Sequence, residues 1–401
     1  MENIFQKKLD EIVCSDIKNL ITIGYKERQS IEYKKEMYGR SDSDKKEMLK
    51  DISSMANAYG GYLLIGIEAD ASGIPIKPFH ISDAEKERDR IEQSCLSSIE
   101  PRISGLKSKT IKLDSGEEII IIFIPRSIKK PHMVSFSGLD QFWIRHNDKK
   151  FPMSVEEIRE ACNNVENIWN DMKQFLKERE LELNKEIGTN AFLIIGSSPI
   201  FIKDDIIDIT EHKIINFLIK PPDQTNENYN LSFELFGGED LYPEPTLSGL
   251  KISFPSYITV ELNRNGYYEA RIPVEMFSYS IKEKERISLI HHKQIINIVV
   301  NYFRALAGLA EILGIEQTIV AYMSLLNIEG LTLEYGKKVL GSNIARSISS
   351  VWPKRNMKIP PKQIFSLNNP DKEAKYFLDR LWNAYGFAKA PYFKDDKYCP
   401  K

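Results

Sequence analysis

Residues 27–34 read ERQSIEYK, and residues 57–70 read NAYGGYLLIGIEAD. The residues between them follow a helical pattern, so two short strands that carry carboxylates are joined by a helix ending at Gly60-Gly61. Acidic side chains on strands cost free energy when they are buried without a counter-charge. Several such side chains close together are typical of a divalent-cation site, so this stretch indicates phosphate-ester chemistry.

Alternation in the first strand assigns its side chains to two faces. Glu32 and Lys34 share an open face by the two-residue period, whereas Ile31 and Tyr33 face a core. The next helix begins with N-cap chemistry around Asp44. Its apolar residues follow at helical spacing and predict one buried side: Met48, Leu49, Ile52, Met55 and Ala56.

The second strand is predicted from the apolar run at residues 62–67, which is typical of a buried strand. By the two-residue period, Gly66, Glu68 and Asp70 fall on one face of it. This pattern predicts that carboxylates from both strands lie near one another.

The chain resembles the Schlafen AlbA-like domain, a nucleic-acid-binding family with endoribonuclease members, over about residues 24–162. Four segments carry the resemblance in the family's order and spacing. They are Glu27 with Glu32-Tyr33-Lys34 (E-x4-E-[FY]-K), residues 55–67, the strand at 119–125 with Lys129-Lys130-Pro131, and residues 142–145 with 152–154. The resemblance implies a domain of mixed sheet and helices that binds nucleic acid.

The resemblance also implies a nuclease site of three carboxylates that bind Mg²⁺ or Mn²⁺. Glu27 and Glu32 match two of these carboxylates. Ala69 stands at the position of the third, so Asp70, by a slip of one residue, or Glu68 would replace it. The predicted catalytic residues are Glu27, Glu32, Lys34, Glu68 and Asp70, and the predicted metal ligands are Glu27, Glu32 and Asp70.

Basic residues of the same domain are the predicted nucleic-acid contacts: Lys129, Lys130, Arg145, His146, Lys149 and Lys150. They would contact the phosphate backbone without reading bases. Lys34 would offset phosphate charge or position the attacking water. Asn147 replaces the glycine usual in the family, and asparagine tolerates a left-handed turn there. A second basic run lies beside Trp352: Lys354, Arg355, Lys358 and Lys362.

Composition bounds the class of protein. The chain has 401 residues, 42% hydrophobic and 28% charged, with a formal net charge of −2, so nucleic-acid binding requires a local patch. The apolar runs are too short to span a bilayer, and the charged N-terminal residues do not resemble a signal peptide. Four scattered cysteines predict a reduced, cytoplasmic protein without a structural zinc site.

The predicted fold class is α+β, with a C-terminal α+β domain of unrecognised type following the Schlafen AlbA-like domain. The predicted parts are an N-terminal helix at 1–22, the first domain at 23–162, a helical connector at 163–188, the second domain at 189–346 and a loosely helical end at 347–401. In the second domain we expect strands at 191–195, 229–236, 250–254 and 258–262, a hairpin at Asn265-Gly266 and a helix at 288–313.

His80, His132, His146 and His212 show no ligand spacing, whereas His291 and His292 could be metal ligands. His291 and His292 adjoin each other near the start of the predicted helix, where neighbouring residues point in different directions, so the pattern disfavours a shared metal there.

Two functions follow from these observations. The first is a metal-dependent nuclease that acts on structured RNA such as tRNA, which the resemblance favours over DNA; a role in anti-phage defence rests on analogy. The second is a non-catalytic DNA- or RNA-binding regulator whose C-terminal domain senses a ligand or mediates oligomerisation. Apolar helices in the C-terminal half also suggest a homo-oligomer, and no membrane partner is expected.

Overall fold

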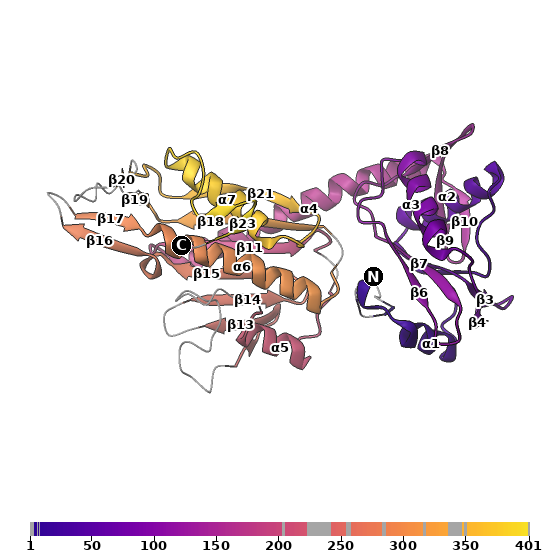
Figure 1. The fold of residues 1–401 in the computed structure, drawn as a ribbon. Coiled ribbons are helices and arrows are strands. Elements are labelled where there is room, and N and C mark those ends of the chain that lie inside the picture. Colours follow the sequence, from indigo (N-terminus) through magenta and orange to yellow (C-terminus); the bar gives the residue numbers. More distant parts are fainter. Residues whose placement is uncertain are drawn as a thin grey trace. The chain divides into compact units, whose positions relative to one another are not determined.

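The computed structural model describes residues 4, 5, 7, 9–202, 205–222, 242–253, 258–282, 286–315, 318–335, 347–348 and 351–399. The chain divides into two compact units, Met1–Asn170 and Asp171–Lys401 (Figure 1). The expected strand at 229–236 lies outside the described residues. Helices and sheets mix in both units, so the predicted α+β class is confirmed.

The first unit contains two four-stranded sheets. The first has the order β1-β2-β7-β6, in which β1 and β2 are parallel and the other pairs antiparallel. The second has the order β10-β9-β8-β5. The strands are β1 (Ile31–Lys34), β2 (Gly61–Ile65), β5 (Ile99–Glu100), β6 (Lys107–Lys112), β7 (Glu118–Ile124), β8 (Met133–Phe136), β9 (Leu139–His146) and β10 (Lys149–Pro152), with a separate hairpin of β3 (Ile67–Ala69) and β4 (Pro75–Pro78).

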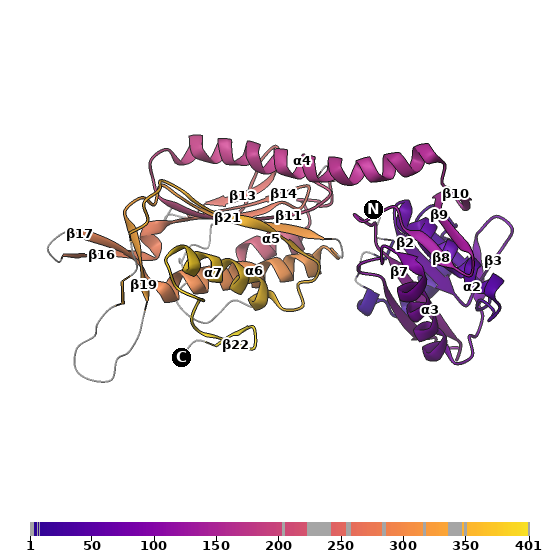
Figure 2. The ribbon, with the colours of Figure 1, turned by 90° about the horizontal axis from the view of Figure 1, so that it is seen from above.

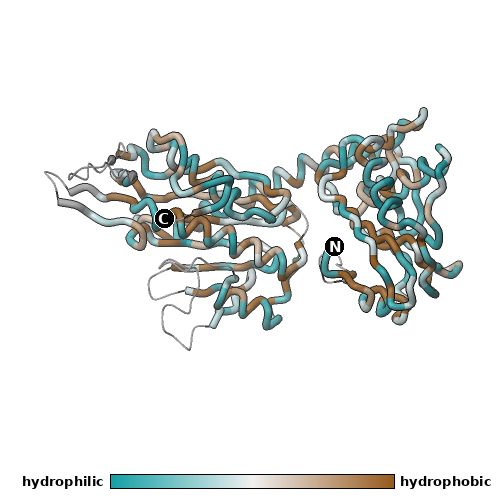
Figure 3. The backbone as a smooth tube through the Cα atoms, in the orientation of Figure 1, coloured by the Kyte–Doolittle hydropathy of each residue, from teal (hydrophilic) through white to brown (hydrophobic). Residues whose placement is uncertain are grey.

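Both faces of the first sheet are covered by apolar side chains. On one face, Leu63 and Ile122 pack with α2 (Asp42–Asn57) and α3 (Ala84–Ser98). On the other, Ile31 and Tyr33 pack with the N-terminal 3-10 helix (Leu9–Glu11) and α1 (Cys14–Thr22). Hydrophobic colour follows these strands in Figure 3. The predicted N-terminal helix at 1–22 is therefore two short helices in the described part of that segment.

Two glycines after α2 allow three chain segments to meet. Gly60 has φ +72°, and a Cβ there would lie 2.5 Å from the carbonyl oxygen of Ile124, the last residue of β7. Gly61 has φ +143°, and a Cβ there would lie 2.1 Å from the Ser30 carbonyl oxygen. Only glycine fits these approaches, so the predicted stop at Gly60-Gly61 also positions β1 beside β2.

The second unit is built on a seven-stranded antiparallel sheet with the order β12-β13-β14-β15-β11-β18-β21. Its strands are β11 (Phe192–Pro199), β12 (Glu244–Pro245), β13 (Gly249–Ser253), β14 (Thr259–Asn263), β15 (Tyr268–Pro273), β18 (Ile319–Leu326) and β21 (Met357–Ile364). The predicted hairpin at Asn265-Gly266 joins β14 to β15 and is confirmed.

Helices cover both faces of this sheet. The second half of α4 (Val155–Ile187) lies along one face, and α5 (His212–Ile219), α6 (His292–Ile312) and α7 (Pro370–Ala384) lie on the other (Figure 2). A smaller sheet contains β16 (Ser278–Lys282), β17 (Arg286–Ile290), β19 (Leu331–Tyr335) and β20 (Ser347–Ile348), and a hairpin of β22 (Phe393–Lys394) and β23 (Lys397–Tyr398) comes last. A 3-10 helix (Val274–Met276) follows β15.

The helical connector expected at 163–188 is a helix, the second part of α4 (Val155–Ile187). Two other local predictions differ from the structure. The helix expected from Ser288 begins at His292, because Ser288 to Ile290 belong to β17. The end expected to be loosely helical contains β21 and α7, and its Trp382 is fully buried, so it belongs to the core of the second unit.

One helix in the described part of the chain, α6, is long and apolar enough to cross a membrane by composition. Its most apolar window is 78% buried within the second unit, as expected for a core helix.

Candidate functional site

Glu27 is fixed immediately before β1 by backbone contacts. Its amide donates to the Gly73 carbonyl at 2.7 Å, and its Oε1 accepts the Tyr33 amide at 2.7 Å. Gly73 has φ +78°, and a Cβ there would lie 2.9 Å from the Cβ of Glu27. The turn at residues 70–74 therefore packs closely against this half-buried carboxylate, and both ends of the Glu27 side chain are positioned.

Glu32 lies between two cations. It is 8% exposed, its Oε1 is 2.7 Å from Lys34 Nζ, and its Oε2 pairs with the Arg145 guanidinium. Arg145 is 2% exposed and donates from Nε to the Asn147 carbonyl at 3.1 Å. Asn147 has φ +58° in the turn between β9 and β10, so the left-handed turn predicted there is present.

Asp51 of α2 joins this cluster and was missed by sequence reasoning. It is 2% exposed, lies 3.5 Å from Lys34 Nζ and 2.5 Å from Lys150 Nζ, and accepts the Tyr38 hydroxyl at 2.7 Å. Its spacing gave a signal, because an acid three residues after Met48 lies on the predicted apolar side of the helix. The face of β1 that carries Glu32 is therefore covered, and the prediction that this face is open was wrong.

The electrostatics of the cluster raise the proton affinity of two of its groups. Burial raises the pKa of Glu27, the Glu32 charge adds to that rise, and the hydrogen bond from the Tyr33 amide opposes it. Burial tends to lower the pKa of Lys34, but Asp51 and Glu32 outweigh it, so the pKa of Lys34 is raised. Lys34 is therefore held as a cation between two acids, while Glu27 is a carboxylate in an unfavourable environment.

The two candidates for the third carboxylate are engaged elsewhere. Glu68 pairs with Lys35 at 2.8 Å and with Lys77 at 3.5 Å. Asp70 accepts the amides of Ser72 and Ile74 through Oδ1 and so closes the turn that packs on Glu27. The shared face predicted for Gly66, Glu68 and Asp70 is absent because Gly66, at φ +99°, separates β2 from β3.

No three His, Cys, Asp or Glu side chains in the described part of the first unit bring ligand atoms within 4.8 Å of one another. The predicted set of Glu27, Glu32 and Asp70 is therefore not assembled. Glu27 and Glu32 remain as a pair, and Asp70 positions the turn beside Glu27.

The predicted basic patch is divided between surface and interior. Lys129, His146 and Lys149 are exposed, and His146 Nε2 lies 2.8 Å from a Glu157 carboxylate oxygen. Lys130 is half-buried, and burial, followed by the nearby Arg126, lowers its pKa. Arg145 and Lys150, which we expected at the surface, pair with Glu32 and Asp51 instead.

Asn57 connects the two segments that carry the basic residues. Its Nδ2 donates to the carbonyls of His132 and Trp143 at 2.9 and 2.8 Å, and its Oδ1 accepts the His132 amide at 2.6 Å. Asn57 is 2% exposed, so these bonds replace water for buried backbone groups. The asparagine at the end of α2 therefore positions the strand that carries Arg145.

The second basic run is paired within the second unit. Lys358 lies 2.5 Å from Glu180, Lys362 lies 2.6 Å from Glu373, and Arg355 donates to Asn327 at 2.7 Å. These ion pairs offset much of the positive charge that suggested a nucleic-acid surface there.

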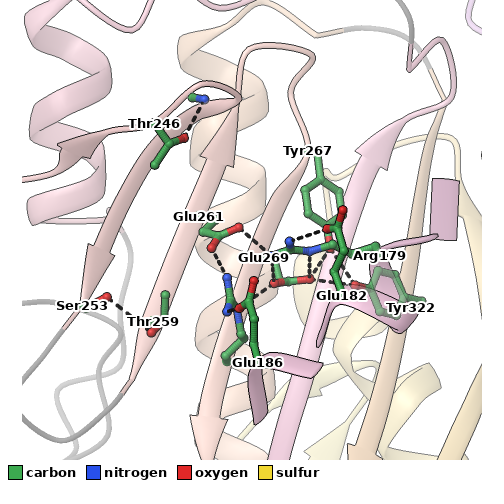
Figure 4. Close-up of polar contacts among 12 residues, drawn as sticks. Arg179, Glu182, Glu186, Thr246, Ser253, Thr259, Glu261, Tyr267, Glu269 and Tyr322 are labelled. Carbon is green, nitrogen blue, oxygen red and sulfur yellow. Dashed lines mark hydrogen bonds and ion pairs between the residues drawn. The ribbon is translucent and has the colours of Figure 1, made fainter. Parts of the chain in front are cut away.

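A buried carboxylate in the second unit has a structural role. Glu269 of β15 is fully buried and accepts from Arg179 at 2.7 Å, from Arg271 at 2.9 Å and from the Tyr322 hydroxyl at 2.9 Å (Figure 4). Glu261 pairs with both arginines as well. Because Arg179 lies on α4, this network attaches the helix to the sheet.

Part of the chain is similar to a known protein family. Residues 27–154 match the family model described as Schlafen, AlbA_2. No curated protein sequence matches the chain.

Solved structures of two other proteins are similar to part of the chain. The DIP2311 protein from Corynebacterium diphtheriae is 18% identical, with a TM-score of 0.27, over 36% of this chain and 30% of its own length. The N-terminal domain of an ATP-dependent DNA helicase RecG-related protein from Nitrosomonas europaea is 19% identical, with a TM-score of 0.26, over 34% of this chain and 88% of that domain. The chain thus spans less than a third of the first of these proteins.

Proposed function

We propose that residues 27–154, which are a Schlafen AlbA_2 domain, bind nucleic acid and hydrolyse its phosphodiester bonds with the help of Mg²⁺ or Mn²⁺. The family match supports nucleic-acid binding. The arrangement of Glu27 and Glu32 supports hydrolysis. RNA is the substrate we propose first, because the resemblance to endoribonucleases favours it; a role in anti-phage defence stays a prediction.

The observation that carries this proposal is the pair of carboxylates at the start of β1. Glu27 is half-buried close to Glu32, and burial together with the Glu32 charge raises its pKa. A bound cation would relieve this cost. Mg²⁺ is commonly held by only one or two carboxylates together with substrate phosphates, so the pair fits such an ion without a third acid.

Glu27 and Glu32 are therefore the residues that would hold the metal. When bound, Mg²⁺ or Mn²⁺ supplies an activated water and offsets the charge that develops on the phosphate. The Tyr33 amide and the turn at Gly73 fix Glu27, while Lys34 and Arg145 orient Glu32. Arg145 is thus a positioning residue in this proposal.

Exposed cations would bring the substrate to the site. Lys129 and Lys149 are exposed, and Asn57 holds the backbone near both of their segments. Contacts from such lysines to phosphates position a nucleic acid without reading its sequence. Binding should therefore weaken with added salt and depend little on sequence.

The experiment is incubation of purified protein with total tRNA, single-stranded DNA and double-stranded DNA in Mg²⁺, in Mn²⁺ and in EDTA. We expect cleavage that needs metal and is lost in Glu27→Gln/Glu32→Gln. Glu36→Gln is the matched control, because it makes the same chemical change at an exposed position of the same segment. Circular dichroism of each variant must show that it is folded, since Glu32 is paired with a buried arginine.

A second candidate function is nucleic-acid binding without hydrolysis. It is favoured by the pairing of Glu68 with Lys35, by the bonds of Asp70 to the amides of its own turn, and by the two cations on Glu32. Binding to tRNA or DNA that persists in EDTA, with no cleavage of any substrate in either metal, would replace the nuclease proposal with this one.

A further inference from the structure

Two parallel strands of the second unit bring three metal-ligating side chains together. β17 pairs in parallel with β19, with Ile290 opposite Leu333. The next residues along the two strands are His291 and Glu334, and His292 then begins α6. One ligand atom from each of His291, His292 and Glu334 lies within 4.8 Å of the other two.

One buried side-chain atom of each of these residues lacks a hydrogen-bond partner among the described residues. The atoms concerned are Nδ1 of His291, Nδ1 of His292 and Oε2 of Glu334, and all three are buried. His292 Nδ1 lies 3.5 Å from Glu334 Oε2, and the His292 residue is only 8% exposed. Buried polar atoms nearly always have hydrogen-bond partners, so three such atoms in one cluster, with only the 3.5 Å contact between His292 and Glu334, indicate a missing positive partner.

We propose that His291, His292 and Glu334 bind a divalent transition-metal ion, with Zn²⁺ as the ion that fits best. Two imidazoles and one carboxylate form an established ligand set for Zn²⁺, which leaves a fourth position open to water or a ligand. Bond lengths of about 2.0–2.2 Å require rotations of these side chains, whose ligand atoms lie within 4.8 Å of one another, and the parallel rings of His291 and His292 must tilt toward one ion.

The surroundings of His292 match those of a metal ligand. Its Nε2 lies 3.0 Å from the Tyr392 hydroxyl, and the two rings stack with centroids 5.8 Å apart. A proton on Nε2 directed at Tyr392 leaves the Nδ1 lone pair facing Glu334. Metal-binding histidines commonly use their second nitrogen in this way, which sets the tautomer and the ring orientation.

The backbone explains why two adjacent histidines can share one ion. His291 precedes the helix as its N-cap, with extended φ and ψ of −77° and 113°. The helical spacing that separates neighbouring side chains therefore does not apply to this pair. Their rings stack at 5.2 Å with an interplanar angle of 6°, and the expectation that they point apart was wrong.

A shared proton is the competing explanation. Glu334 lies near the N-terminus of α6, where the helix dipole stabilises a carboxylate, and a protonated His292 would then complete the pair. The two explanations differ in a measurable way. Only a bound metal ion gives a complex of fixed stoichiometry that a chelator removes.

The test uses the untagged full chain carrying Glu27→Gln/Glu32→Gln, which removes the carboxylates proposed to bind metal in the first unit. The protein is titrated with Zn²⁺ and, in parallel, with Co²⁺ as a spectroscopic probe. We expect a single Zn²⁺ per chain that survives dialysis, a thermal midpoint raised by Zn²⁺ and lowered again by chelator, and visible Co²⁺ absorption.

Variants locate the ion. Glu334→Gln and His291→Gln should abolish the Zn²⁺-dependent rise in midpoint, and Tyr392→Phe should weaken Zn²⁺ binding by about 10- to 100-fold. His212→Gln is the matched control, because His212 is exposed on α5. Zinc-edge X-ray absorption of the Glu27→Gln/Glu32→Gln protein, which keeps all three proposed ligands, should show imidazole and oxygen ligands and no sulfur. This measurement does not depend on whether the ligand variants fold. Sulfur ligands, an unchanged midpoint with Zn²⁺, or full binding in Glu334→Gln would overturn the proposal.

Discussion

Glu32 illustrates how a single buried carboxylate depends on its counter-charges. It is 8% exposed, and Lys34 and Arg145 pair with its two oxygens. Removing one partner of a buried pair leaves a charge without compensation, so the pair mainly specifies the positions of both side chains. Glu27 is in a different position. Its carboxylate lies near that of Glu32 and accepts a hydrogen bond from the Tyr33 amide.

Replacement of Glu27 by Gln should change stability in a pH-dependent way. Burial and the nearby Glu32 raise the pKa of Glu27 above its ordinary value of 4.5. The folded state therefore binds this proton more tightly than the unfolded chain does. The stability that comes from protonated Glu27 is fully present below pH 4.5, and it is lost as the pH rises through the raised pKa of Glu27.

We therefore expect Glu27→Gln to be more stable than the natural chain at about pH 7 and similar to it at about pH 4, since glutamine keeps the acceptor for the Tyr33 amide. Urea unfolding of the first unit in both proteins, followed by hydrogen exchange of its amides across this pH range, measures the difference. Glu36→Gln, at an exposed position, should show no comparable trend. Equal unfolding free energies for Glu27→Gln and the natural chain at every pH would refute the electrostatic argument.

At the scale of elements, α2 determines where the site residues lie. One side of the helix packs against the first sheet, Asp51 projects from that side into the charged cluster, and Asn57 bonds the chain at His132 and Trp143. Because α2 packs on the first sheet and is hydrogen-bonded to the segment at His132 and Trp143, it fixes the positions of both relative to each other. The location of Arg145 thus depends on an amide at the opposite end of the domain sequence.

Asn57→Ala should destabilise the first unit. It leaves two carbonyls and one amide without their partner, and each unsatisfied buried group costs about 1–3 kcal/mol. Because the neighbouring groups can relax, we expect a loss of about 3 kcal/mol in unfolding free energy, together with faster hydrogen exchange at the His132 amide. Ser43→Ala, at an exposed position of α2, is the control. Unchanged exchange at His132 would contradict this role of Asn57.

At the scale of the whole molecule, each unit has a hydrophobic core of its own. Two apolar clusters belong to the first unit and lie on opposite faces of its sheet. A larger cluster packs the seven-stranded sheet against α6 and α7 in the second. Units with separate cores can unfold separately, so a single unfolding free energy does not describe the chain.

Scanning calorimetry should therefore resolve two transitions that respond to different substitutions. Glu269→Gln removes a buried charge that binds Arg179 and Arg271, and should lower the transition of the second unit by the equivalent of about 3–5 kcal/mol. Asn57→Ala should lower only the other transition. Glu275→Gln, at an exposed position near β15, controls for charge removal. A single transition that both substitutions lower would show that the units unfold together.

Local patterns in the sequence determined much of the fold. Alternation and apolar runs predicted β1, β2 and β7, helical spacing predicted α2, and Asn265-Gly266 predicted the hairpin of β14 and β15. Four short segments in order were sufficient to identify the domain that the family model matches. These features depend on interactions between near neighbours, which the sequence displays directly.

Only the tertiary structure decided which charged side chains meet. Asp51 is distant from Glu32 in sequence but joins its cluster through helix packing, and Arg145 is buried because β9 places it against Glu32. His291 and Glu334 lie together because two strands run parallel. Such contacts depend on how elements pack across long stretches of chain, and burial then determines which charges must pair, so spacing alone could not reveal them.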